Sequence, residues 1–96
     1  MEPDNAMAYN GKAVAFDTAG NHTAALEIYE KALSLSPYSP AIKNNMAMSM
    51  ILNDQLDDAI HMLEALYEEA PDTPKVRHNL ALAHGLKGNH KRAQEL

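Results

Sequence analysis

The sequence predicts an all-α solenoid of stacked antiparallel helix pairs, and three observations support this class. Residues 42–59 and 76–93 share one pattern at a distance of 34 residues, and residues 8–25 continue it one period earlier. Apolar residues recur within each period at three- and four-residue spacing, as expected of amphipathic helices. Turn-forming residues and prolines divide each period into two helical segments. A period of this length with two helices is typical of helical repeat proteins.

Several residue types recur at equivalent positions of the repeat. They are small residues where helices approach, prolines, turn residues and helix N-caps. The columns are Ala13, Ala47 and Ala81; Ala25, Ala59 and Ala93; Pro3, Pro37 and Pro71; Gly20, Asp54 and Gly88; and Asn5, Ser39 and Thr73. A larger side chain in the first of these columns would overpack the helix contact at a cost of ~1–3 kcal/mol.

Helix limits follow from these columns. Helices are expected over residues 6–19, 22–35, 40–52, 56–70 and 74–87, with a final helix near the end of the chain. Asn, Ser and Thr of the N-cap column precede three of them, and Pro40 and Pro74 occupy the first helical position, where a missing N–H has no cost. The turns within units are expected at Gly20-Asn21, Asn53-Asp54 and Gly88-Asn89, and Pro37 and Pro71 end the second helices.

The repeat also predicts the domain organisation. Residues 6–39 form a first unit, residues 40–73 a second and residues 74–96 a truncated third, while residues 1–5 resemble the end of a preceding unit. We therefore expect one solenoid segment of a longer protein, with about two full repeats. Each unit of such an array contacts mainly its neighbours, so an end unit needs a cap or another repeat.

Composition excludes several function classes. The 96 residues are 46% hydrophobic, contain no cysteine and carry a net charge of −5, so thiol chemistry and nucleic-acid binding are not expected. No apolar run is long enough for membrane insertion. The charge is uneven, because residues 1–72 carry three Lys/Arg against twelve Asp/Glu and residues 73–96 carry five against one. The acidic residues of 54–69 are interpreted as solvated surface; alternatively, they meet a basic partner, with Lys87, Lys91 and Arg92 of this chain as one candidate.

The first helices of stacked pairs line a concave groove, and one face of them carries an apolar column flanked by Asn and His. Apolar anchors would supply affinity for a peptide, and the amides would bind its backbone. The candidate groove residues are Asn10, Val14, Asn44, Asn45, Met48, Ile51, Lys75, His78, Asn79 and Leu82. The alternative is that Met48 and its column are core or contact a docked neighbouring helix. Met46 and Met50 fall in packing columns and are expected in the core.

Neither a metal site nor an active site is expected. No two of the five histidines have the i, i+4 spacing that places two imidazoles on one helical face, so all five are interpreted as surface residues. Asp57 and Asp58 are adjacent and point apart on a helix. No set of nucleophile, base and orienting group is found, so no cofactor is expected.

The period and the order of residue types resemble the tetratricopeptide repeat (TPR). The matching residues are Tyr9, Ala13, Phe16, Ala25, Tyr29, Ala32 and Pro37 in unit one, Met46, Ala47, Met50, Ala59, Leu63 and Pro71 in unit two, and Leu80, Ala81 and Ala93 in unit three. Lys12, Leu66 and His84 depart from the pattern. The resemblance implies a right-handed superhelical solenoid that binds proteins. A carboxylate clamp for chaperone C-termini is not expected, since only Asn45 and Lys75 match its five positions.

Three stretches further resemble TadD proteins, which are TPR lipoproteins of bacterial tight-adherence (Flp) pilus systems. The stretches are residues 10–17, 44–49 and 76–86, with Lys12 and Met46 as departures. The resemblance implies a role in Flp pilus assembly or secretion at the periplasmic face of the outer membrane. A secretin or another pilus component would then be the partner, and the parent protein would carry a lipid on an N-terminal cysteine.

The sequence therefore predicts a protein–protein interaction scaffold without catalytic activity, which binds a peptide or partner in its groove. Two alternatives stay open. One is a generic cytoplasmic TPR adaptor, and the other is a structural segment that self-associates through its ends and its acidic and basic surfaces.

Overall fold

The computed structural model describes residues 5–96, so the prediction for Pro3, and all but Asn5 of the preceding unit predicted in residues 1–5, lie outside the described residues. Over this range the chain forms only α-helices. They are α1 (Ala6–Thr18), α2 (His22–Leu35), α3 (Pro40–Leu52), α4 (Leu56–Glu69), α5 (Pro74–Lys87) and α6 (His90–Glu95). Two expected helices, those of 6–19 and 56–70, end one residue earlier than predicted. None of these helices has the length and apolar character that crossing a bilayer requires.

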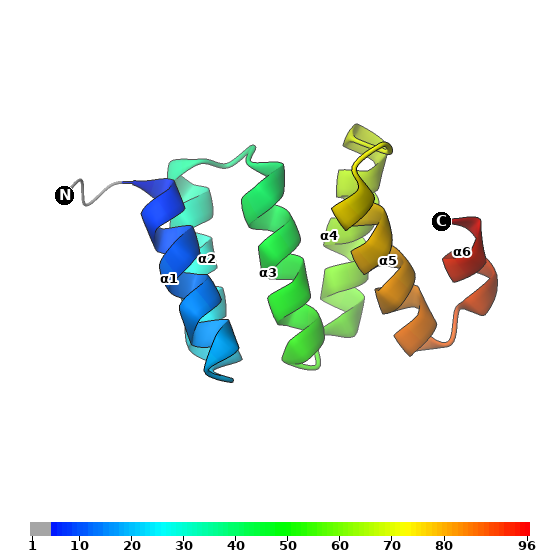
Figure 1. Ribbon diagram of the computed structural model, residues 1–96, viewed down its shortest axis with the longest axis horizontal. Coiled ribbons are helices and arrows are strands. Elements are labelled where there is room, and N and C mark those ends of the chain that lie inside the picture. Colours follow the sequence, from blue (N-terminus) through cyan, green and yellow to red (C-terminus); the bar gives the residue numbers. More distant parts are fainter. Residues whose placement is uncertain (1–4) are drawn as a thin grey trace.

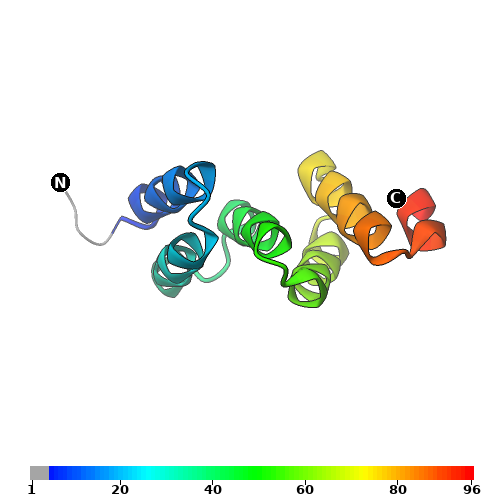
Figure 2. The same cartoon turned by 90° about the horizontal axis from the view of Figure 1, so that it is seen from below.

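The helices pack as consecutive antiparallel pairs in an elongated array of 46 × 27 × 17 Å (Figure 1). Each second helix packs against the first helix of the following pair, so that α2 contacts α3 and α4 contacts α5. Seen from below, the helices alternate between two layers along the array (Figure 2). The predicted all-α solenoid of helix pairs is thus confirmed.

The helix starts depend on side-chain caps in two of the three predicted positions. Asn5 Oδ1 accepts hydrogen bonds from the backbone N–H groups of Met7 (2.9 Å) and Ala8 (3.3 Å), and Ser39 Oγ accepts one from Ile42 N (3.3 Å). Thr73 also lies at an N-cap position, but its side chain makes no cap bond. The predicted N-cap position of Thr73 is therefore confirmed, and α5 begins there without a side-chain hydrogen bond. Pro74, at the first helical position, has no backbone N–H, so this helix start has one hydrogen-bond donor fewer to satisfy.

One turn geometry is repeated between the helices of all three pairs. The backbone N–H groups of Asn21, Gln55 and Asn89 each donate over 2.8 Å to the carbonyl five residues earlier. This bond belongs to the Schellman motif, which requires a left-handed residue just before the donor. Gly20, Asp54 and Gly88 occupy that place with φ of 84°, 60° and 92°. Glycine adopts this conformation freely and aspartate tolerates it, so the predicted turn column has a backbone cause.

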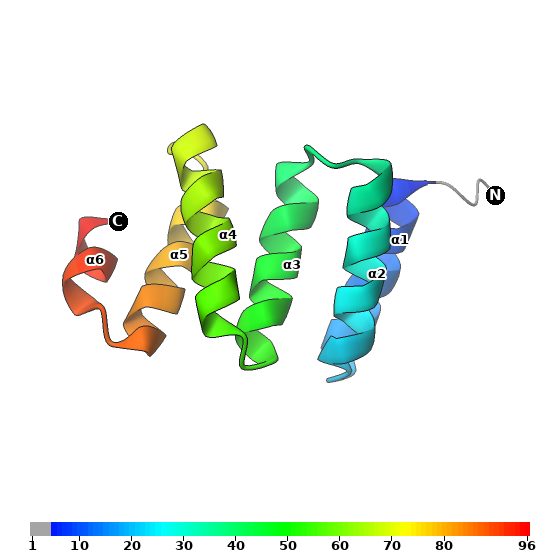
Figure 3. The same cartoon turned by 180° about the vertical axis from the view of Figure 1, so that it is seen from behind.

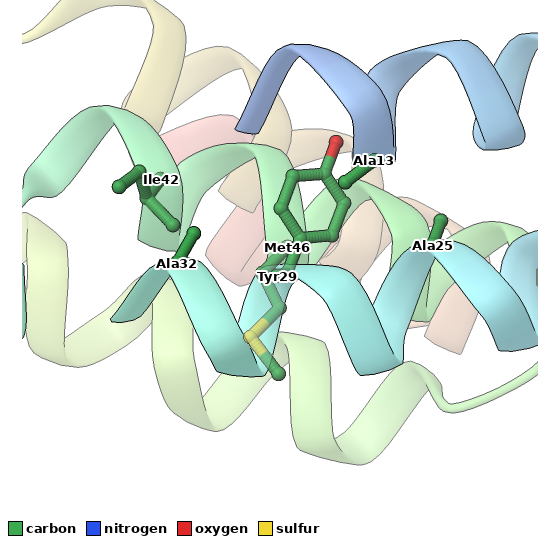
Figure 4. Packing of buried hydrophobic residues seen from close by; sticks show 6 residues of the cluster. All are labelled: Ala13, Ala25, Tyr29, Ala32, Ile42 and Met46. Atoms are coloured by element: carbon green, nitrogen blue, oxygen red, sulfur yellow. The ribbon is translucent and has the colours of Figure 1, made fainter. Parts of the chain in front are cut away.

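The core consists of two clusters that each join successive pairs. In the first, the Tyr29 ring packs among small and apolar side chains of α1, α2 and α3, with its hydroxyl directed toward α1 (Figure 4). The second cluster joins Ala47 and Leu63 to Val76 and Leu80 of α5. Full burial of each large apolar side chain stabilises the fold by about 1.5–3 kcal/mol. Met46 is buried as predicted, whereas Met50 is half-buried and packs against the edge of the first cluster.

A polar cluster lies beside the first core and connects three helices. Asp17 Oδ1 accepts hydrogen bonds from Ser49 Oγ at 2.7 Å and from His22 Nδ1 at 2.8 Å, while Asp17 Oδ2 accepts one from the Tyr29 hydroxyl at 3.3 Å. Ser49 is fully buried. Burial, together with the Asp17 carboxylate beside the phenol, raises the pKa of Tyr29 well above its ordinary value. The cluster ties α1 and α2 of the first pair to α3 of the second.

A second polar cluster anchors α6 to α4 and α5. Arg92 donates from Nη2 to Glu64 Oε1 at 2.6 Å and from Nε to Glu64 Oε2 at 3.3 Å. These hydrogen bonds from Arg92 lower the pKa of the Glu64 carboxyl. His84 is buried next to the Arg92–Glu64 ion pair. Its Nδ1 lies 3.1 Å from Asn89 Nδ2, and its Nε2 lies 3.5 Å from Glu64 Oε2. The expectation that all histidines lie on the surface is therefore wrong for His84, which occupies the same repeat column as Phe16 and Met50.

The basic end of the chain meets acidic groups within the same molecule. Lys87 Nζ lies 2.6 Å from Asp57 Oδ1, and Arg92 binds Glu64 as described above. Thus two of the three cations proposed as partners for the acidic surface pair with α4 of their own chain. Glu64 is half-buried, which corrects its interpretation as fully solvated surface.

We expect Asp17→Ala to lower the free energy of unfolding by about 2–4 kcal/mol, since it leaves two buried hydroxyls without an acceptor. Urea unfolding followed by circular dichroism measures this change. Asp72→Ala removes an exposed carboxylate in a loop and should stay within about 0.5 kcal/mol of the original protein. Equal losses in the two variants would contradict the role given to Asp17.

The raised pKa of Tyr29 predicts a loss of stability in alkali. Above about pH 10 tyrosine ionises in the unfolded chain while folded Tyr29 keeps its proton, so the unfolded state binds fewer protons and rising pH favours unfolding. This contribution is fully present below about pH 10 and falls by about 1.4 kcal/mol per pH unit above it. Tyr29→Phe should have a shallower decline in urea unfolding measured between about pH 9 and pH 11. Parallel declines in both proteins would refute the assignment.

Candidate binding groove

Six of the ten predicted groove residues line one open cleft between α3 and α5, the first helices of the second and third pairs. The cleft has a volume of about 440 Å³. Its lining residues are Asn44, Asn45, Met48, Pro74, Lys75, His78 and Asn79. Pro74 was not among the predicted residues, although its position at the start of α5, directly before Lys75, places it at the mouth of the cleft. The period of the repeat thus brings together residues about 30 positions apart in the sequence.

The apolar column of the first helices is accessible along the array. Val14 of α1 is 41% exposed and Leu82 of α5 is 40% exposed, while Met48 between them is half-buried and lines the cleft. A partner that covers such exposed apolar side chains removes them from water, and this favours binding. Ile51 differs from this column, because it packs against the second core cluster.

The asparagines form hydrogen-bonded pairs that connect successive units. Asn45 Nδ2 donates to Asn10 Oδ1 at 3.2 Å, and Asn79 Nδ2 donates to Asn44 Oδ1 at 3.0 Å. In both pairs the acceptor lies 35 residues before the donor. Asn10, Asn44 and Asn79 are less than a tenth exposed, whereas Asn45 is half-buried. These amides therefore hold the floor of the groove, and part of their hydrogen-bonding capacity is used within the protein.

The charge of the cleft differs from that of the whole chain. Its charged or titratable lining groups are Lys75 and His78, both exposed, and no carboxylate lines it. A chain with a net charge of −5 thus presents a neutral-to-basic patch on its inner face. Since exposed charges mainly steer encounter, this patch favours an approaching segment that carries acidic groups.

No group of three or more His, Asp or Glu side chains within residues 5–96 is arranged to hold a metal ion. The Asp17 cluster brings a serine, a histidine and an aspartate together, but the carboxylate is the common acceptor of both other groups. In a catalytic triad the nucleophile bonds to a base, and a third group orients that base. Here Ser49 and His22 both bond to Asp17. The cluster is best explained as a structural connection.

Comparison with known proteins agrees with the repeat geometry. A family model described as "Tetratricopeptide repeat" matches residues 18–82. The chain belongs to the tetratricopeptide repeat family. Among curated proteins, an uncharacterised protein (y4yS) of Sinorhizobium fredii is 42% identical over 50 residues, and a TPR repeat-containing thioredoxin (TTL4) of Arabidopsis thaliana is 40% identical over 48. These stretches cover 52% and 49% of the chain but only 28% and 7% of the two relatives.

Solved structures show the same TPR arrangement. The TPR domain of Sgt2 from Aspergillus fumigatus superposes with a TM-score of 0.90 at 23% identity, over 98% of this chain and 62% of that one. A mutant of MamA gives a TM-score of 0.79 at 18% identity, over 95% of this chain and 66% of that one. At these identities the likeness concerns the fold. Because TPR domains generally act as non-catalytic scaffolds, the fold supports a protein–protein interaction role.

The asparagine pairs of the TPR groove can be tested by removing one donor. Asn79→Ala leaves the buried Asn44 oxygen without its partner, so we expect a loss of about 1–3 kcal/mol in the free energy of unfolding. His78→Ala removes an exposed neighbour and should cost less than about 0.5 kcal/mol. Urea unfolding of both variants measures the difference. Similar small losses would show that the pair contributes nothing to the contact between units.

Proposed function

We propose that this TPR segment binds an extended or helical segment of a partner protein in the groove between α1, α3 and α5. The observation that carries the proposal is the cleft around Met48, which six of the predicted groove residues line. The exposed Val14 and Leu82 extend its apolar surface in both directions. Methionine between them adapts its shape to different apolar side chains, and Asn45 is the most accessible of the amides.

We further propose that the partner belongs to the assembly or secretion apparatus of a tight-adherence (Flp) pilus. This part of the proposal rests on the resemblance of residues 10–17, 44–49 and 76–86 to TadD proteins. A secretin or another pilus component would then occupy the groove, at the periplasmic face of the outer membrane. The generic cytoplasmic adaptor and the self-associating segment are the alternatives that an experiment has to separate.

Photo-crosslinking in the cells that produce this protein tests both parts. A photoreactive residue at position 48 should capture a partner, because Met48 lies in the cleft, whereas one at exposed position 27 of α2 should not. Mass spectrometry then identifies the captured protein. Capture of a secretin or another pilus component supports the pilus assignment, and capture of cytoplasmic proteins refutes it while keeping the groove.

Two further results would overturn the binding of another protein in this groove. Capture at position 27 and none at position 48 would place the partner elsewhere, and Met48 would then be a packing residue. Crosslinks from position 48 to a second copy of the chain would favour the structural, self-associating alternative.

A further inference from the structure

A second groove lies on the opposite side of α3 from the concave cleft, between α3 and α4. It has a volume of about 400 Å³. Met50 of α3 and Met62 and Leu66 of α4 provide its apolar part. The view from behind shows α2 and α4 on either side of α3, with α3 between them (Figure 3). This outer groove shares no lining residue with the concave cleft.

The floor of the outer groove is firmly supported by the core. Met50 and Met62 are half-buried and pack against the first cluster, and Met62 and Leu66 also belong to the second. The two half-buried methionines therefore contact both the core and the groove, whereas Leu66 is 2% exposed and mainly supports them. A methionine floor at a groove between helices suits an amphipathic helix, because thioethers adapt to branched and aromatic anchors alike.

The ends of the outer groove specify the charge of the occupant. Asp58, at the start of α4, and Glu69, at its end, both line the groove and are exposed. They are eleven positions apart on the helix, which corresponds to about 16 Å at about 1.5 Å per residue. Lys43 and His61 also line the groove. The antiparallel packing of α3 on α4 places Lys43 toward the Glu69 end, and His61, which carries charge only when protonated, lies three residues after Asp58. The helix α4 carries Glu68 beside Glu69, so the surroundings are acidic as well.

We propose that the outer groove binds a basic amphipathic helix of another protein. Its apolar face, with anchors at i, i+3 or i+4 and i+7, covers Met50, Met62 and Leu66. Lysine or arginine side chains about three turns apart reach Asp58 and Glu69. Charge complementarity argues for this occupant over the chain's own basic end, because Lys87 and Arg92 already pair with α4 in the same molecule.

The test measures binding of a fluorescent synthetic helix to the purified chain. The probe has about 14 residues, leucines at helical spacing and lysines about eleven residues apart, and a scrambled peptide of equal composition is its control. Ala65 lines the groove and is exposed, so Ala65→Lys fills it without changing the core. We expect at least about tenfold weaker binding by this variant. Ala15→Lys, at an exposed position of α1, is the matched control and should bind as the original chain does.

Charge variants separate the groove from general attraction to an acidic protein. Asp58→Asn with Glu69→Gln should weaken binding about three- to tenfold at low salt, and Glu68→Gln, a neighbouring acid that does not line the groove, should have little effect. Lys43→Gln should tighten binding about two- to threefold. Met48→Lys, in the concave cleft, should leave the affinity for the synthetic helix unchanged.

Equal binding of the scrambled peptide, or no effect of both Ala65→Lys and the Asp58/Glu69 double variant, would overturn the proposal. Circular dichroism of each variant establishes that it is folded. Analytical ultracentrifugation of the chain alone provides the remaining outcome: a concentration-dependent dimer that Ala65→Lys abolishes would mean that a second copy fills the groove, and the proposal would be wrong.

Discussion

The fold depends on burial between successive helix pairs, because a single pair has no second surface on which to bury its apolar face. The Tyr29 contact shows what this burial requires. Its ring needs Ala13 on one side and Ile42 and Met46 of the next pair on the other, and all four side chains are nearly inaccessible. Alanine at position 13 keeps the backbones close, and the aromatic ring fills the space that this leaves. Removal of either pair would expose the remainder of the cluster.

The same dependence explains where polar groups are buried. Asp17, Ser49 and Tyr29 connect the first two pairs, and the Asn44–Asn79 pair connects the second and third. A buried polar group without a partner costs about as much as a lost apolar side chain, so each of these bonds requires the correct register of neighbouring units. Apolar contact favours stacking in general, and the polar bonds restrict it to one arrangement.

The helices, the turns and the fold class could be predicted from the sequence because each depends on local residue types repeated at a fixed period. The left-handed residues Gly20, Asp54 and Gly88 illustrate this most clearly. Six of the predicted groove residues lie in one cleft, because equivalent positions in stacked units face the same way. His84 occupies the column of Phe16 and Met50, which indicates a packing position, but its polar partners could not be foreseen because Glu64 and Arg92 come together only when α6 folds back.

The outer groove was not predicted for a related reason. Met50 occupies a packing column, and the pattern correctly indicates that it contacts the core. No pattern within one helix indicates that the space between α3 and α4 stays open, because this depends on how the two helices pack.

Helix α3 therefore separates two surfaces of different character. Met48 and Met50 are two residues apart, which places them about 200° around the helix from each other at about 3.6 residues per turn. Met48 faces the cleft with Lys75 and His78, while Met50 faces the groove with Asp58 and Glu69. Partners of opposite charge would thus contact opposite sides of one helix. Because α3 is held by both core clusters, the two contacts can form together without competing for a side chain.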